Sequence, residues 1–136
     1  MNLPPLTNIA LVALGGMIGA LLRVGLAVAV PNPPDGFPWT TFLENVVGAY
    51  LLGLLLAVLA RRFPDSDRVR LLLGTGLLGS FTTFSNYSVE IVQLATDSPA
   101  VALAYALASV IVALAAALAG LASVGRGAAR AGEATT

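Results

Sequence analysis

The sequence predicts an all-α integral membrane protein with four transmembrane helices per subunit. Of its 136 residues, 57% are hydrophobic and only 10% are charged, and its mean hydropathy of +0.89 lies well above that of an ordinary soluble domain. Four apolar segments each reach the about 20 residues that a helix needs to cross the hydrocarbon core of a bilayer. We expect one domain, 1–136, with spans at 7–30, 40–60, 69–94 and 99–123 and a flexible tail at 124–136.

The connections between these segments carry residues that stop membrane helices. Residues 31–38, PNPPDGFP, contain four prolines and a glycine, which predicts a loop at one membrane face. Trp39 follows this loop at the depth expected of an interfacial tryptophan. Residues 61–70 form a charged turn, and residues 97–99, Asp-Ser-Pro, are typical of the start of a helix.

The charged and reactive residues exclude several classes of protein. Seven arginines oppose seven acidic residues, and Lys, His and Cys do not occur. No basic surface is therefore expected for nucleic acid, and no disulfide, thiolate or imidazole chemistry is available. The isolated carboxylates give little support for an enzyme.

The third segment combines glycines with hydroxyl side chains in the middle of an apolar span. Residues 74–79, GTGLLG, match a dinucleotide-binding pattern by chance, since no strand precedes them. The glycines and the following Ser80, Thr82 and Thr83 favour a helix broken near mid-membrane, where freed backbone groups are tolerated only if protein, water or an ion uses them. The alternative is a continuous helix whose hydroxyls bond back to its own carbonyls.

Three ionisable residues fall inside the predicted spans, where an unpaired charge is costly. These residues are Arg23, Glu44 and Glu90. Arg23 and Glu44 could neutralise each other as a buried ion pair. Beside Glu44, Asn45 shares a helix face with Thr41 and Gly48, so Asn45 is the better candidate to line a polar path.

Small residues recur at helical spacing in the first two spans, at Gly15 and Gly19 and at Ala49 and Gly53. Such residues allow helix backbones to approach closely. The close approach could lie within one chain or between two subunits of an oligomer, and the pattern does not distinguish the two.

With these motifs in place, the chain resembles the Fluc (CrcB-type) fluoride channels over nearly its whole length. The resemblance rests on GGMIGALLR at 15–23, on TFLEN at 41–45 followed by Gly48, and on GSFTTFSNYSVE at 79–90. Tyr105 and Ser109 add a weaker match in the fourth span. The stretch at 79–90 is the most specific of these pieces.

The resemblance implies an antiparallel, dual-topology-type dimer in the cell membrane with two narrow fluoride pores. It implies a structural Na+ ion at the centre of the interface and passive export that protects against fluoride toxicity. Asn45 would be the pore amide, and Phe84 and Tyr87 the aromatic pair whose ring edges meet the anion. Thr41, Thr83, Glu90, Tyr105 and Ser109 would belong to the polar path, Arg23 to the vestibule, and the Gly79 and Thr82 carbonyls to the sodium site.

Three residues depart from the pattern that the resemblance leads us to expect. Tyr87 replaces a second phenylalanine, and its hydroxyl could either donate to fluoride or narrow a pore. Glu44 stands where an apolar residue is usual, and Ala113 stands where relatives often carry a hydroxyl.

The arginines of the connections lie on one side of the predicted membrane domain. They are Arg61, Arg62, Arg68, Arg70, Arg126 and Arg130. This bias should fix both termini in the cytoplasm. An antiparallel homodimer requires insertion in both directions, so we hypothesise a heterodimer with a homologous subunit of opposite bias, while a homodimer stays open.

Two other classes compete with the channel interpretation. A small multidrug or cation exporter can also be a four-span antiparallel dimer, but it would need a glutamate in the first span and an aromatic cage for organic cations. Here the first span carries Arg23, and Trp39 is the single tryptophan. A non-conducting assembly subunit would show no dependence on Asn45 or Phe84.

Overall fold

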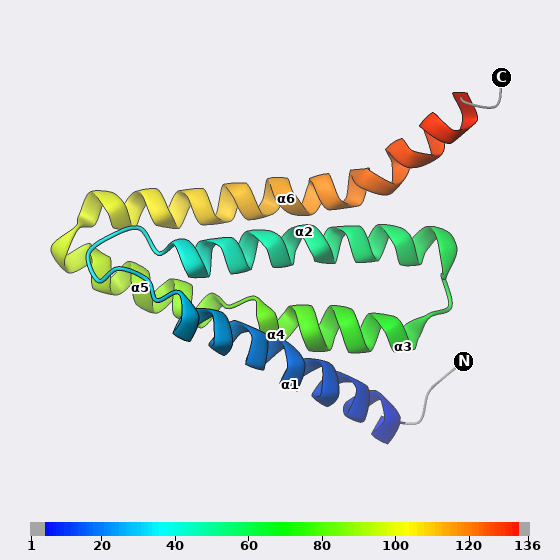
Figure 1. Ribbon diagram of the computed structural model, residues 1–136, viewed down its shortest axis with the longest axis horizontal. Helices are drawn as coiled ribbons and strands as arrows, with labels where there is room; N and C mark the ends of the chain where they lie inside the picture. The colour runs from blue at the N-terminus through cyan, green and yellow to red at the C-terminus, as the bar shows by residue number, and fades with distance from the viewer. Residues whose placement is uncertain (1–4, 134–136) are drawn as a thin grey trace.

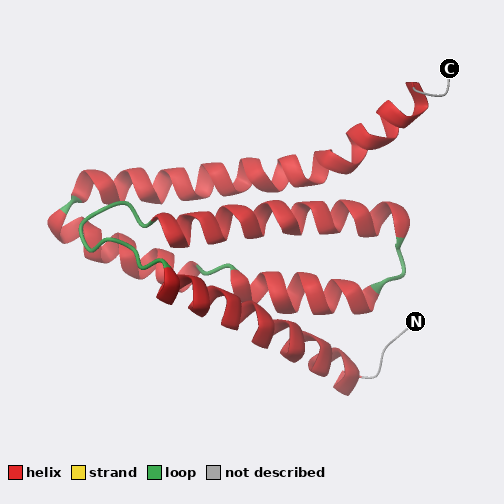
Figure 2. Ribbon diagram, viewed as in Figure 1, coloured by secondary structure: helices red, strands yellow, loops and turns green. Residues whose placement is uncertain are grey.

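The computed structural model describes residues 5–133 of the chain, and all the regular structure in that range is helical, as predicted. The helices are α1 (Pro5–Ala29), α2 (Trp39–Arg62), α3 (Asp67–Val69), η1 (Arg70–Leu78), α4 (Gly79–Phe81), α5 (Phe84–Asp97) and α6 (Pro99–Glu133). Figure 2 shows that only short loops join them.

Three helices are long and apolar enough to cross a membrane by length and composition: the segments Leu6–Ala29 of α1, Trp39–Arg62, which is all of α2, and Pro99–Val124 of α6. A fourth, interrupted segment runs from α3 through η1 and α4 to α5, and Figure 1 shows it beside α2. The loop before α2 and the turn before α6 lie at one end of the bundle, and the turn after α2 lies at the other. The chain is therefore a multi-pass membrane protein.

Glycines bring the helices together within this single chain. A Cβ atom added at Gly15 would overlap the Leu72 carbonyl, and one at Gly19 would overlap the Leu77 carbonyl, so α1 lies directly on η1. Gly53 of α2 meets the Ala117 carbonyl of α6 in the same way. The interpretation of these small residues as packing inside one chain is thereby confirmed for Gly15, Gly19 and Gly53.

The third segment is broken, which confirms the prediction and rules out the continuous helix. The last turn closes with the N–H of Thr82 donating to the Leu78 carbonyl at 3.1 Å. Thr82 and Thr83 are then extended, with ψ values of 152° and 123°. Thr83 caps α5, since its side chain accepts from the N–H of Asn86 at 3.2 Å.

The break lies after the glycines rather than at them. Residues 70–78 continue as a π-helix through Gly74 and Gly76. A Cβ atom at Gly76 would come within 2.8 Å of the Val12 carbonyl on α1. These glycines therefore permit a wide helix to pack against α1, and the loss of helical structure falls on the hydroxyl residues that follow.

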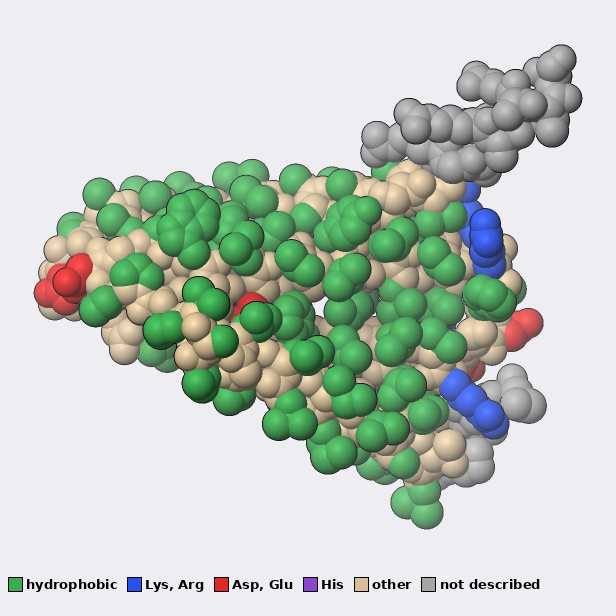
Figure 3. Space-filling view, in the orientation of Figure 1, with side chains coloured by type: hydrophobic (Ala, Val, Ile, Leu, Met, Phe, Trp, Pro, Cys, Tyr) green, Lys and Arg blue, Asp and Glu red, His purple; other side chains and the backbone are tan. Residues whose placement is uncertain are grey.

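Charge is confined largely to the two ends of the bundle. Figure 3 shows hydrophobic side chains over its flank and arginines at the end where the N terminus lies. A flank covered by hydrophobic side chains is what contact with lipid requires.

The fourth helix runs further than predicted, because α6 extends to Glu133 although we expected a flexible tail from residue 124. Alanine recurs through residues 122–131, and alanine has the highest helix propensity.

Candidate functional site

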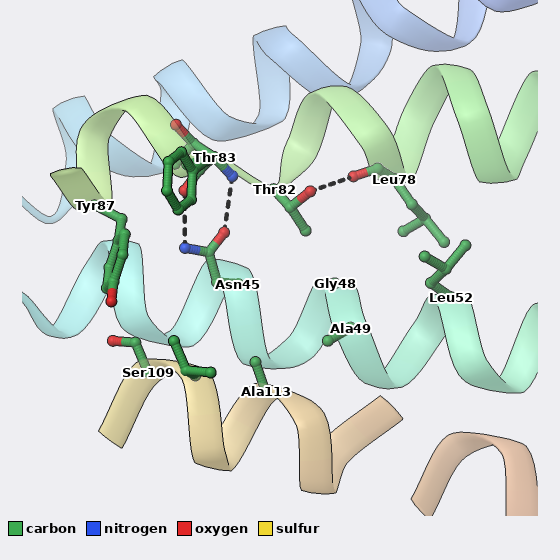
Figure 4. A pocket seen from close by; sticks show the side chains of 12 residues that line it. Asn45, Gly48, Ala49, Leu52, Leu78, Thr82, Thr83, Tyr87, Ser109 and Ala113 are labelled. Atoms are coloured by element: carbon green, nitrogen blue, oxygen red, sulfur yellow. Dashed lines mark hydrogen bonds between the residues drawn. The ribbon is translucent and has the colours of Figure 1, made fainter. Parts of the chain in front are cut away.

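A cavity of about 340 Å³ lies where α2, the break in the third segment and α6 meet. Figure 4 shows this cavity with its lining side chains drawn from all three parts of the fold. Its lining residues are Asn45, Gly48, Ala49, Leu52, Leu78, Thr82, Thr83, Phe84, Tyr87, Ser109, Val110 and Ala113. The cavity thus brings together six of the predicted site residues: Asn45, Thr82, Thr83, Phe84, Tyr87 and Ser109.

Asn45 bridges the break in the third segment. Its Oδ1 accepts from the N–H of Thr83 at 2.8 Å, and its Nδ2 donates to the Thr83 carbonyl at 3.0 Å. Figure 4 shows this pair of hydrogen bonds crossing from α2 to the interrupted backbone. Thr83 is only 7% exposed, so water cannot readily serve its backbone N–H and C=O. The two bonds to Asn45 therefore satisfy backbone groups that the broken helix leaves without partners.

Ser109 contributes a free hydroxyl to the same cavity. The residue is 5% exposed, and its Oγ has no hydrogen-bond partner within the described part of the chain. Polar atoms buried this deeply are normally paired, and an unpaired one calls for an explanation such as a ligand. Ala113 follows Ser109 by one helical turn and also lines the cavity, so this side of α6 offers one hydroxyl rather than two.

The two predicted aromatic residues lie at the edge of the cavity. Their ring centroids are 5.6 Å apart, and Phe84 is 79% exposed in this single chain. The hydroxyl of Tyr87 donates to the Ala106 carbonyl on α6 at 2.9 Å. Tyr87 therefore ties α5 to α6.

Glu90, Thr41 and Tyr105 form a separate polar cluster beyond the cavity. The Oε1 atom of Glu90 accepts from the Thr41 hydroxyl at 2.7 Å, and Oε2 accepts from the Tyr105 hydroxyl at 2.6 Å. Tyr105 is completely buried. Thr41 thus bonds to Glu90 rather than lining the cavity beside Asn45, although both lie on α2.

Asn32 also belongs to this cluster, and sequence reasoning missed it. Its Nδ2 donates to Oε1 of Glu90 at 2.8 Å and to Oγ1 of Thr41 at 3.0 Å. The available signal was a lone amide between prolines shortly before Thr40 and Thr41, which we read only as part of a loop. Nothing in that pattern says that the loop folds back over α5.

Arg23 and Glu44 do not form the expected ion pair. Arg23 donates from Nε to the Ser80 carbonyl at 3.2 Å, next to the break. Glu44 is 3% exposed, and its Oε1 has no partner in the described residues. Glu44 lines a second cavity of about 240 Å³, together with residues that include Leu26 and Phe81. The Arg23 guanidinium therefore binds the Ser80 carbonyl beside the break instead of the Glu44 carboxylate. The sequence alone did not reveal this contact.

The break also leaves backbone carbonyls without helical partners. The N–H of Thr83 would close the next turn on the Gly79 carbonyl, but it donates to Asn45 instead. Within the described residues no cluster of three His, Cys, Asp or Glu side chains could hold a metal ion. A hard cation would therefore depend on backbone oxygens such as those of Gly79 and Thr82, and oxygen ligands of this kind suit it.

Comparison with known proteins gives a consistent result. Residues 10–121 match the family model described as "CrcB-like protein, Camphor Resistance (CrcB)". The fluoride-specific ion channel FluC of Agrobacterium fabrum is 48% identical over 122 residues, covering 85% of this chain and 94% of its own. The FluC of Novosphingobium aromaticivorans is 45% identical over 130 residues, covering 91% and 100%. FluC 2 of Streptomyces avermitilis is 46% identical over 102 residues, which span 74% of this chain and 65% of that protein.

Proposed function

Because this chain belongs to the CrcB-like family, we infer that it is a fluoride-selective ion channel that lets fluoride leave the cell passively. The relatives compared above carry the name of fluoride-specific ion channels. The first span of this chain has no carboxylate and its cavity has no tryptophan, which argues against the multidrug exporter.

The structural observation that carries this proposal is the buried, unpaired hydroxyl of Ser109 at the cavity. Fluoride is small and strongly hydrated, so a selective path must replace its water with several hydrogen-bond donors. The unpaired hydroxyl of Ser109 and the second N–H of Asn45 are neutral donors at one cavity. Neutral donors hold an anion without the strong binding that a fixed positive charge would give.

We propose that the conducting form is an antiparallel dimer. The exposure of Phe84 at the edge of the cavity supports this, because a second subunit would cover the ring and close the path. Arg61 and Arg62 at the end of α2, and Arg68 and Arg70 just after the following turn, lie at one end of the bundle (Figure 1). Asp35 in the loop before α2 and Asp97 at the end of α5 lie at the other. This bias supports a heterodimer with a homologous chain of opposite orientation and cytoplasmic termini for this one.

We further propose that a Na+ ion is held at the dimer centre by the Gly79 and Thr82 carbonyls. The diversion of the Thr83 N–H to Asn45 supports this site, since it frees the Gly79 oxygen from helical bonding. The ion would neutralise carbonyl dipoles that would otherwise face each other across the interface.

The test is fluoride efflux from liposomes that contain this chain, reconstituted alone and together with a homologous chain of opposite charge bias, measured with a fluoride electrode beside a chloride electrode. We expect fluoride-selective efflux that falls in Ser109→Ala and persists in Ser88→Ala. Ser88 is a matched control because its hydroxyl donates back to the Phe84 carbonyl of its own helix at 2.8 Å. Equal loss in both variants, or chloride efflux as fast as fluoride efflux, would refute the proposal.

The heterodimer is tested by orientation. We expect tags on both termini of the chain, expressed alone, to be found on the cytoplasmic side only, and efflux to require a second chain of opposite bias. Equal populations on the two sides, together with efflux from this chain alone, would establish a homodimer instead.

A further inference from the structure

The loop between α1 and α2 reaches into the Glu90 cluster through one side chain, that of Asn32. Three donors meet the Glu90 carboxylate: the Thr41 hydroxyl of α2, the Tyr105 hydroxyl of α6 and the amide of Asn32. Asn32 is the one donor of the three that comes from a loop. The loop is thus hydrogen-bonded to the same carboxylate as two helices.

Asn32 is itself held in a single orientation. Its Oδ1 accepts from the backbone N–H of Thr40 at 2.8 Å, in the first turn of α2. Its Nδ2 must then face Thr41 and Glu90, at 3.0 Å and 2.8 Å. An amide whose oxygen accepts from a backbone N–H cannot rotate by half a turn without facing that N–H with its own donors.

This orientation decides where the proton of the Thr41 hydroxyl goes. Because Oγ1 of Thr41 accepts from Asn32, its own O–H is left to donate, and the acceptor within reach is Oε1 of Glu90 at 2.7 Å. Asn32 therefore delivers two donors to one carboxylate oxygen, one directly and one through Thr41. Hydrogen bonds to a charged acceptor are the strong ones in such networks.

We propose that Asn32 is a positioning residue, which fixes the carboxylate of Glu90 and the proton of Thr41 at the end of the conduction path. This proposal rests on the proposed channel function, to which it adds a loop residue outside the four membrane segments. Asn32 acts through Glu90 and does not need to touch the ion.

The decisive variant is Asn32→Asp, which keeps the shape of the side chain and replaces its donor by an acceptor. Two carboxyl groups at hydrogen-bonding distance share one proton, so efflux should become dependent on pH. We expect about tenfold slower efflux at about pH 8 and recovery at about pH 5.5. The other titratable groups near Glu90 are Tyr105 on α6 and Glu44 on α2, and neither changes in this variant. Wild type and Asp35→Asn, a control in the same loop, should lack this dependence.

The double variant Asn32→Asp with Glu90→Gln tests the coupling without relying on transport. The amide introduced at position 90 can donate to the carboxylate introduced at position 32, so the donor and acceptor exchange places. We expect the loss of thermal stability in Asn32→Asp, measured in detergent, to be reduced in the double variant. This readout distinguishes the two proposals, because it holds even if wild-type protein moves no fluoride.

Three results would overturn the positioning role: a pH profile of Asn32→Asp equal to that of wild type, additive stability losses in the double variant, or failure of both variants to fold. If Asn32→Asp fails to fold while the double variant folds, the coupling is supported.

Discussion

Replacing Asn45 with aspartate should abolish fluoride conduction. The same variant tests whether the hydrogen bonds from Asn45 to Thr83 stabilise the interrupted third segment. The change removes the Nδ2 donor that lies 3.0 Å from the Thr83 carbonyl and puts a carboxylate oxygen in its place. Leaving that buried carbonyl without a donor costs about 1–3 kcal/mol of stability. The bond from the Thr83 N–H to Oδ1, 2.8 Å long, is retained and strengthened by the charge, so the fold should survive.

The effect on fluoride is larger than the effect on the fold. A carboxylate about 4 Å from an anion repels it by about 4 kcal/mol at an effective dielectric constant of about 20. That energy corresponds to about a thousandfold loss of occupancy, because each 1.4 kcal/mol is a factor of about ten. Fluoride efflux from liposomes should therefore fall below detection in Asn45→Asp.

Two further variants show whether the charge or the broken bridge is responsible. Asn45→Ala removes both hydrogen bonds without adding charge and should lower stability more than Asn45→Asp does. Asn86→Asp adds the same charge to α5, on a side chain that does not line the cavity, and should conduct. Efflux from Asn45→Asp within about threefold of wild type would refute the electrostatic reasoning.

Three other substitutions have defined outcomes. Tyr87→Phe should retain fluoride efflux and lose about 1 kcal/mol of stability, because the hydroxyl donates to the Ala106 carbonyl; loss of efflux with unchanged stability would show that it serves the ion. Glu44→Gln should raise the thermal unfolding temperature in detergent, since it removes a buried carboxylate whose Oε1 is unpaired in the described part of the chain, and a lower temperature would reveal a partner for that carboxylate. Gly53→Ala should cost about 1–3 kcal/mol, because the added methyl group meets the Ala117 carbonyl; Gly25→Ala, where nothing lies within 4 Å, should be neutral or stabilising, and equal effects would contradict the packing argument.

The membrane fold follows from sequence because hydropathy and length are local properties. The apolar runs, the proline loop at 31–38 and the hydroxyl-rich stretch after Gly79 each act within a few residues. The break at Thr82 and Thr83 was predictable for the same reason. The π-helix was not, since it depends on how closely Gly76 approaches α1.

Pairing of polar groups was harder to predict because it depends on distances between segments. Arg23 and Glu44 carry opposite charges on neighbouring helices, yet Arg23 bonds to the Ser80 carbonyl. Asn32 and Glu90 are 58 positions apart, and only the fold brings them together. Sequence reasoning named the helix residues that the structure places at the cavity and around Glu90, and it missed Asn32 on the loop.

The bridge between Asn45 and Thr83 has a consequence for how ions could pass. A helix interruption is usually the place where a membrane protein bends, but here both backbone groups of the unwound residue are bonded to a neighbouring helix. The interruption is clamped and cannot act as a hinge without losing two buried hydrogen bonds. The Asn45 amide is therefore preorganised, and an ion would meet this donor already in place. A path that needs no rearrangement at this interruption needs no energy input there, so the electrochemical gradient of the anion would set the direction of flow.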